Sequence, residues 1–201
     1  MKGWKQKMVN RLKKTFKDNS RENLVNTLTN LGIKGEMRER GAMEEKIGDK
    51  WWTRRLGLIS IEDNPIKWIN ICKRDRGKDS PPQWRYIFII PQERLGSGQN
   101  KIKIKTIRKK NFPIFGQIMD VIWKGNDGKL GEALSNDPEI KKLAQKIGDI
   151  HLESLSDPIS GWMFRISITR HLGGQSDFHK LITSETWGQI RKLSDILETN
   201  L

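Results

Sequence analysis

The chain has 201 residues, of which 38 are Lys or Arg and 24 are Asp or Glu, so its formal net charge is +14 at pH 7. This length is enough for a domain with its own hydrophobic core, and eight Trp and six Phe residues argue against disorder throughout. The single cysteine, Cys72, excludes an intramolecular disulfide and a thiolate metal cluster within one chain.

Positive charge is concentrated in the first part of the chain. Lys and Arg outnumber Asp and Glu in residues 1–125, whereas acidic residues slightly outnumber basic ones in residues 126–201. Such a field attracts nucleic acid or an anionic lipid surface, although a basic face that is merely solvated has the same composition. No apolar run approaches the roughly 18 residues of a membrane-spanning helix, and no secretory signal is visible. We therefore expect a cytoplasmic protein, with association to a membrane surface still open.

Residues 1–35 are predicted to form a basic amphipathic helical arm, beginning with a helix over residues 2–17. Its apolar and cationic side chains fall on opposite sides: Trp4, Met8, Leu12 and Phe16 on one, and Lys7, Arg11, Lys13 and Lys14 on the other. Such a helix can pack on its own domain, lie in a lipid interface or bind a protein partner, and the sequence leaves all three open. A second helix, capped by Asn19 or Ser20, is predicted to end near Leu31.

Residues 36–50 mix charges of both signs with glycines, so they are predicted to be a linker to a domain over residues 51–201. Strands over residues 56–62 and 66–73 flank Asp63, Asn64 and Pro65, which predicts a hairpin.

The strand over residues 84–90 is apolar on both faces, which predicts a central position in the sheet. Trp84 and Tyr86 on this strand, with Trp68 on the one before, are aromatic side chains on which nucleic-acid bases could stack. Core packing is the commoner role of aromatic residues in strands, so this stacking is a secondary hypothesis.

The stretch 101–124 is where we place the middle of the fold. Side chains at positions 102, 104 and 106 alternate with Lys101, Lys103 and Lys105, the pattern of a strand with one buried and one solvated face. Further basic residues extend the charge past the expected strand end, and a second strand over residues 117–124 follows a corner at residues 112–116. The predicted anion-binding residues are the cations of this stretch and one on the preceding strand, Arg85, provided that the register suits: Lys101, Lys103, Lys105, Arg108, Lys109, Lys110 and Arg85.

Beyond residue 125 the sequence predicts two helices, then two strands, then an amphipathic helix that begins at Ser184. The helices are expected at residues 130–134 and 138–147, and Asp137 is predicted to cap the second, with Pro138 at its first position. The strands are expected at residues 149–155 and 161–170. The fold class is therefore α+β: a mainly antiparallel sheet or partial barrel of about seven strands covered by helices, with the C-terminal helix sealing the core.

Seven strands followed by a helix that carries Trp187 resemble, in element order, pleckstrin-homology-like domains. The resemblance covers residues 51–201 and departs from that pattern by placing helices between the fifth and sixth strands. Members of that family that bind inositol lipids carry basic residues in the first hairpin loop, where this chain has Glu62 and Asp63. The resemblance therefore implies no function for this chain.

Motifs of catalysis are missing from the sequence, including phosphate-binding loops, zinc-protease helices and hydrolase elbows. His171, Asp177 and His179 could supply metal ligands, but ordinary loop histidines are the commoner explanation, so we predict no metal and no cofactor. His151 and Glu153 alternate on one strand and could form a pair that moves protons.

The sequence thus predicts a non-catalytic interaction domain that binds an anionic macromolecule through its basic strand, with nucleic acid ahead of anionic lipid. The first alternative is peripheral membrane association through the N-terminal helix. The second is an enzyme with an unrecognised site that contains a histidine.

Overall fold

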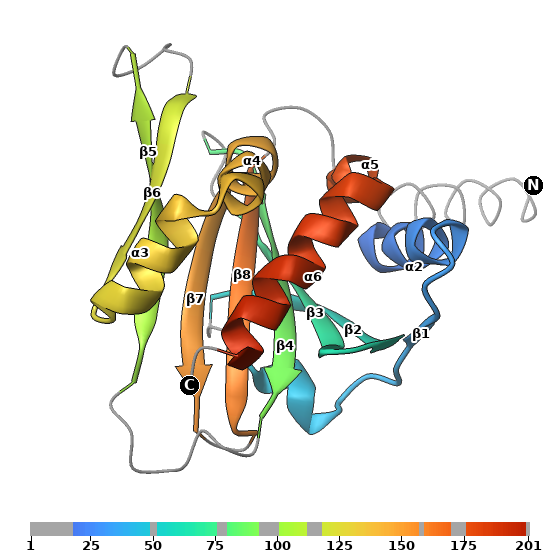
Figure 1. Ribbon diagram of the computed structural model, residues 1–201. Coiled ribbons are helices and arrows are strands. Elements are labelled where there is room, and N and C mark those ends of the chain that lie inside the picture. Colours follow the sequence, from blue (N-terminus) through green and yellow to red (C-terminus); the bar gives the residue numbers. More distant parts are fainter. Residues whose placement is uncertain are drawn as a thin grey trace, which may run out of the picture.

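A computed structural model describes residues 18–48, 52–75, 80–92, 101–111, 118–156, 159–169 and 176–199. Within these ranges the chain forms one antiparallel sheet of eight strands with helices on one face, which confirms the predicted α+β class (Figure 1). The sheet is open rather than a partial barrel. The predicted amphipathic helix over residues 2–17, from Trp4 to Phe16, lies outside the described residues.

The strands are β1 (Gly35–Met37), β2 (Arg54–Asp63), β3 (Ile66–Arg74), β4 (Gln83–Pro91), β5 (Lys103–Lys110), β6 (Ile118–Gly125), β7 (Asp149–Leu155) and β8 (Gly161–Thr169). Their order in space is β1-β2-β3-β4-β8-β7-β5-β6. The predicted hairpin of β2 and β3 and the central position of β4 are confirmed. The resemblance to pleckstrin-homology-like domains concerns only the order of elements along the chain. In space β8 lies beside β4, so the order of the strands in the sheet differs from their order along the chain.

The helices are α2 (Ser20–Asn30), α3 (Gly128–Asn136), α4 (Pro138–Ile147), α5 (Phe178–Leu181) and α6 (Ser184–Thr199), and η1 (Met43–Lys46) is a single 3-10 turn. The start of α4 is as predicted, because the Asp137 side chain accepts hydrogen bonds from the backbone N–H groups of Glu139 and Ile140. In the described part of the chain, no helix is both long enough and apolar enough to cross a membrane.

The main hydrophobic core lies between the helices and one face of the sheet (Figure 1). Phe88 of β4 stacks on Phe164 of β8 with ring centroids 4.6 Å apart, and it also contacts Phe178 of α5 and Trp187 of α6. Even-numbered side chains of β4 and β8 thus face the helices, and odd-numbered ones face the other side.

Two of the aromatic residues proposed for base stacking belong to this core. Trp84 and Tyr86 are buried on the helix-covered face of β4. Burial raises the pKa of the Tyr86 phenol, which keeps it neutral. Both aromatic side chains therefore pack against protein, and neither can stack on a base.

The start of the described chain is part of the domain and not a separate arm. Leu24 and Leu28 of α2 are fully buried in the main core. The carboxylate of Asp18 accepts a hydrogen bond from Trp84 Nε1 at 3.0 Å and lies 3.5 Å from Lys73 Nζ. Asp18 also accepts a hydrogen bond from the backbone N–H of Ser20. The first turn of α2 is therefore held by Asp18, which precedes the two predicted caps, Asn19 and Ser20.

Residues 36–48, which we predicted to belong to a linker, are also packed against the sheet. Residues 35–37 pair with β2 as the edge strand β1, and η1 lies against the face opposite the helices. Few apolar residues mark this segment, because only Ile47 supplies a large buried apolar side chain and β1 has just three residues. These contacts join the segment to strands that are distant in the sequence, so its charged, glycine-rich composition does not predict them.

The basic hairpin lies at an edge of the sheet and not at its middle. The strands β7 and β8 separate β5 from β4, which leaves β6 as the outer strand. The strand β5 also extends to Lys110, so Arg108 and Lys109 belong to the strand rather than to a segment beyond it.

Candidate anion-binding site

On the face opposite the helices, the strand register brings side chains into rows that run across the sheet. One row consists of Trp68, Ile89, Met163, Glu153 and Lys103, on β3, β4, β8, β7 and β5. The next row, two residues along each strand, consists of Asn70, Ile87, Arg165, His151 and Lys105. This face therefore changes from mostly apolar over β3 and β4 to charged over β7 and β5.

Residues 43–48 cover the apolar part of this face. Ile47 packs in a second, smaller cluster with Cys72, Ile87, Ile89 and Met163. The side chain of Asn70 donates hydrogen bonds to the carbonyl oxygens of Glu45 and Ile47, at 2.7 and 3.2 Å. Gly48 has a φ of +68° and approaches so closely that a Cβ would lie 3.0 Å from the Met163 sulfur. The segment thus forms a wall that stands on β3 and β4.

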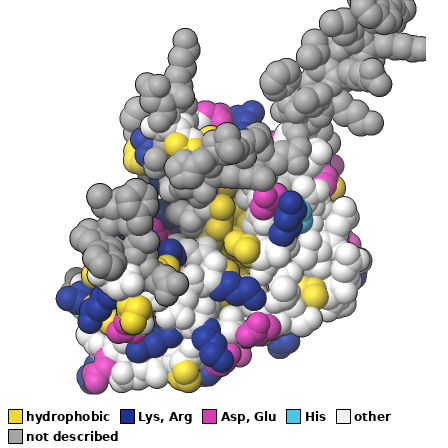
Figure 2. Space-filling view, turned by 90° about the horizontal axis from the view of Figure 1, so that it is seen from above, with side chains coloured by type: hydrophobic (Ala, Val, Ile, Leu, Met, Phe, Trp, Pro, Cys, Tyr) yellow, Lys and Arg dark blue, Asp and Glu magenta, His cyan; other side chains and the backbone are white. Residues whose placement is uncertain are grey.

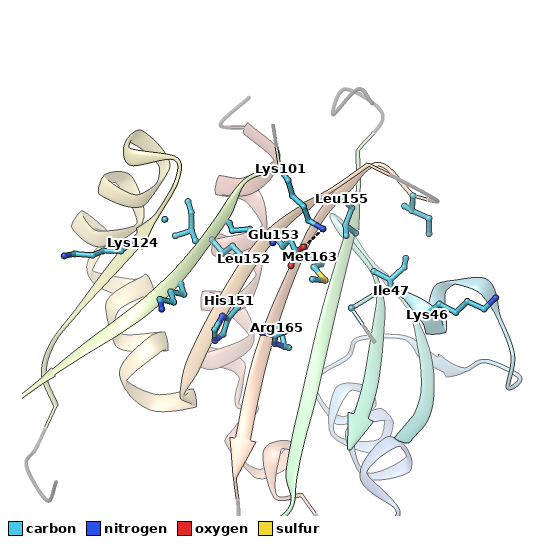
Figure 3. A pocket seen from close by; sticks show the side chains of 16 residues that line it. Lys46, Ile47, Lys101, Lys124, His151, Leu152, Glu153, Leu155, Met163 and Arg165 are labelled. Carbon is cyan, nitrogen blue, oxygen red and sulfur yellow. Dashed lines mark ion pairs between the residues drawn. The ribbon is translucent and has the colours of Figure 1, made fainter. Parts of the chain in front are cut away.

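Between this wall and the β5–β6 hairpin lies a pocket of about 590 Å³ (Figure 3). Its cationic lining residues are Lys46, Lys101, Lys103, Lys105, Lys124 and Arg165. Its larger apolar lining residues are Ile47, Ile104, Leu152, Leu155, Ile159 and Met163. Glu153 is the one carboxylate among the described lining residues, so the pocket has a large surplus of positive charge.

The three predicted strand lysines all line this pocket. Lys101 forms an ion pair with Glu153, which neutralises it (Figure 3). Lys103 and Lys105 are exposed, and neither makes an ion pair with a residue in the described ranges. Two ammonium groups of the predicted set therefore remain available to an anion.

The other predicted cations do not join this pair. Arg108 lies on the helix-covered face, where its Nε is 3.4 Å from a carboxylate oxygen of Asp149. Successive side chains of a strand point to opposite faces, and the buried side chains of β5 are at even-numbered positions. Arg108 is also at an even-numbered position, so it faces the same side. Lys109 is exposed but outside the pocket lining, and the Lys110 side chain lies outside the described structure. Arg85 shares the pocket face, but β8 and β7 separate its strand from β5.

The pocket floor contains a cation that the sequence analysis missed. Arg165 lies directly opposite His151 on the neighbouring strand, and both side chains are half-buried (Figure 3). The alternation of β8 places Arg165 on its polar face. Only the pairing of β8 with β7 shows that this face meets His151 and Lys105.

Electrostatics at the floor favour an incoming anion. Burial lowers the pKa of His151 most, and the charge of Arg165 lowers it further, against the opposing effect of Asp149. The imidazole is therefore neutral at neutral pH, and a bound anion would favour its protonated, doubly donating form. The buried Nε of Arg165 finds no acceptor in the described part of the chain, and an anion would supply one.

The sequence suggested two roles for histidines, proton transfer by His151 with Glu153 and metal binding by His171, Asp177 and His179. His151 and Glu153 share the pocket face as predicted, but Glu153 is paired with Lys101 and no hydrogen bond joins it to His151 in the described structure. His179 lies in α5, whereas His171 lies outside the described residues. Among the residues that are described, no group of three His, Cys, Asp or Glu side chains could hold a metal ion.

Charge is mixed on the end of the described surface that Figure 2 shows. Figure 2 looks onto the end of the molecule that is uppermost in Figure 1, and it shows Lys and Arg side chains interspersed with Asp and Glu. Ion pairs such as Lys34 with Glu62 and Lys192 with Asp137 balance cations on the outer surface. The pocket differs from these areas because the cations of its described lining outnumber the one carboxylate there.

No protein family, curated protein or solved structure matches this chain. The chemistry of the pocket is therefore the basis for the functional argument.

Proposed function

We propose that this protein is a non-catalytic interaction domain that binds single-stranded nucleic acid on the pocket side of its sheet. The observation that supports this proposal is the meeting of Lys103, Lys105, Arg165 and His151 in one pocket, whose described lining has a single carboxylate that is already paired. Phosphate groups are the anions that such a set of donors recognises best, since Lys and Arg release the counterions of the phosphate backbone on binding.

A single strand suits this site better than a duplex. Arg165 and His151 lie at the floor of the pocket, half-buried, and the groups that contact them must enter it. A flexible single strand can lower a phosphate into such a pocket, whereas the phosphates of a rigid duplex stay on its cylindrical surface.

The same pocket implies binding by charge and shape with little sequence preference. Trp68, the remaining aromatic candidate for stacking, is partly buried against the Ile47 cluster and does not line the pocket. The described lining contains no Phe, Tyr or Trp side chain, so stacking on those rings contributes nothing there.

We expect the full-length protein to bind a fluorescently labelled single-stranded oligonucleotide with strong salt dependence, measured by fluorescence anisotropy. With about three phosphate contacts, log K should fall against log salt with a slope of about −2, because each contact to a single strand contributes about −0.7.

Flotation with anionic phospholipid vesicles provides the competing measurement on the same full-length chain. If the protein floats with the vesicles but binds no oligonucleotide at low salt, the lipid alternative replaces the nucleic-acid proposal. If it binds the oligonucleotide and stays in solution with the vesicles, the nucleic-acid proposal holds.

A further inference from the structure

The pocket has two chemically different halves on adjacent rows of the sheet. Lys105, His151 and Arg165 occupy one row on the neighbouring strands β5, β7 and β8. Adjacent strands lie about 4.8 Å apart, so these three side chains can converge on one group the size of a phosphate. This half is a site for a single tetrahedral anion.

The other half is apolar and partly accessible. Met163 lies two residues before Arg165 on the same face of β8, and Ile47 of the wall packs beside it. Leu155 and Ile159 are partly buried against this cluster and line the pocket. A step of two residues along a strand is about 7 Å, so a sugar fits between a phosphate on the cationic row and a ring on the apolar row.

Glu153 lies where the two halves meet. It is directly opposite Met163 on one side and Lys103 on the other, and Lys101 pairs with it. A carboxylate at this place disfavours a phosphate over the apolar half and accepts hydrogen bonds from sugar hydroxyl or base amino groups. It therefore disfavours a purely apolar anion such as a fatty acid.

We infer that the pocket holds one nucleotide of the bound strand, with its phosphate on Lys105, His151 and Arg165 and its base against the apolar half, which includes Ile47, Leu155 and Met163. This inference rests on the proposed function and names the unit that the site recognises. A volume of about 590 Å³ is within the usual range for small-molecule sites, roughly 300–1,000 Å³. Apolar side chains hold unstacked bases in other nucleic-acid-binding proteins, so aliphatic residues suffice.

The test compares three competitors for the labelled single strand on the full-length protein. They are the unlabelled strand, an abasic sugar-phosphate oligomer of the same length, and inorganic phosphate. We expect the abasic oligomer to bind about 10-fold more weakly than the intact strand, because it lacks the base whose apolar surface the aliphatic side chains would bury. Equal affinity for the two oligomers would overturn the inference and leave the proposed function standing, whereas binding of neither would overturn the proposed function itself.

A nucleoside monophosphate identifies the source of the nucleotide. If it competes as well as the intact strand, the occupant is a free nucleotide, and if it competes only weakly but better than inorganic phosphate, the occupant is one unit of a strand. If the nucleotide competes no better than inorganic phosphate, the result contradicts binding of the base in the apolar half of the pocket.

Leu155→Ala provides a second readout, with Leu181→Ala of α5 as the matched control. Leu155 lines the pocket, whereas Leu181 is partly buried against the main core on the other face of the sheet. The Leu155 variant should bind the intact strand several-fold more weakly and the abasic oligomer unchanged, and the control should bind both like the wild type. An equal loss of affinity for both oligomers, or no loss for either, would contradict contact between the base and the apolar half of the pocket.

Discussion

Replacing Lys103 and Lys105 together by Glu is expected to lower the affinity for a single-stranded oligonucleotide by on the order of 10- to 100-fold at about 0.1 M salt. Both side chains are exposed in the pocket without an ion-pair partner among the described residues, so their charge is available to the ligand. Each replacement removes one phosphate contact and adds a repulsion. The slope of log K against log salt should also become shallower by about 1.4, which is two contacts at about 0.7 each.

The matched control is Lys67→Glu with Lys142→Glu, which changes the net charge by the same amount. Both lysines are exposed and outside the pocket, and their partners, Asn64 and Glu139, lie at the surface. Surface contacts of this kind contribute roughly 0–1 kcal/mol to stability, so the control should fold normally. If it loses as much affinity as the pocket variant, binding follows net charge and the pocket has no special role.

Replacing Phe88 by Ala is expected to lower the free energy of unfolding by about 3–5 kcal/mol. Phe88 is fully buried and touches rings from β8, α5 and α6, so its removal leaves a cavity where the sheet and both helices meet. The helices fill much of the space around the ring, and they cannot collapse into the cavity without losing other contacts.

Urea denaturation followed by circular dichroism measures this loss. Met119→Ala on β6 is the control, because that side chain is 66% exposed and its truncation should change stability by no more than about 0.5 kcal/mol. A loss below about 1.5 kcal/mol for Phe88→Ala would mean that α5 and α6 do not share a core with β4.

Local patterns in the sequence predicted most elements. A run that is apolar on both faces predicted β4, alternating residues predicted β5, and the Asp137–Pro138 pair predicted the start of α4. These signals depend on residues close together in the chain, and they persist in the structure because period and capping act locally.

The same local patterns could not predict which distant strands pair in the sheet. Nothing local shows that β7 and β8 enter between β5 and β4, and that insertion moves the basic hairpin to the edge and brings Arg165 beside His151. The wall at residues 43–48 was missed for a related reason. Its attachment depends on Asn70, a polar side chain 25 residues away from Glu45, and on the close approach of Gly48.

The most direct test of anion binding in the pocket is an NMR titration of the isotopically labelled protein with a short single-stranded oligonucleotide. We predict that the largest amide shift changes fall on residues 103–105, 151–153 and 163–165, which lie side by side on β5, β7 and β8. Shift changes concentrated on α3, α4 and α6, or none at saturating oligonucleotide, would contradict the account.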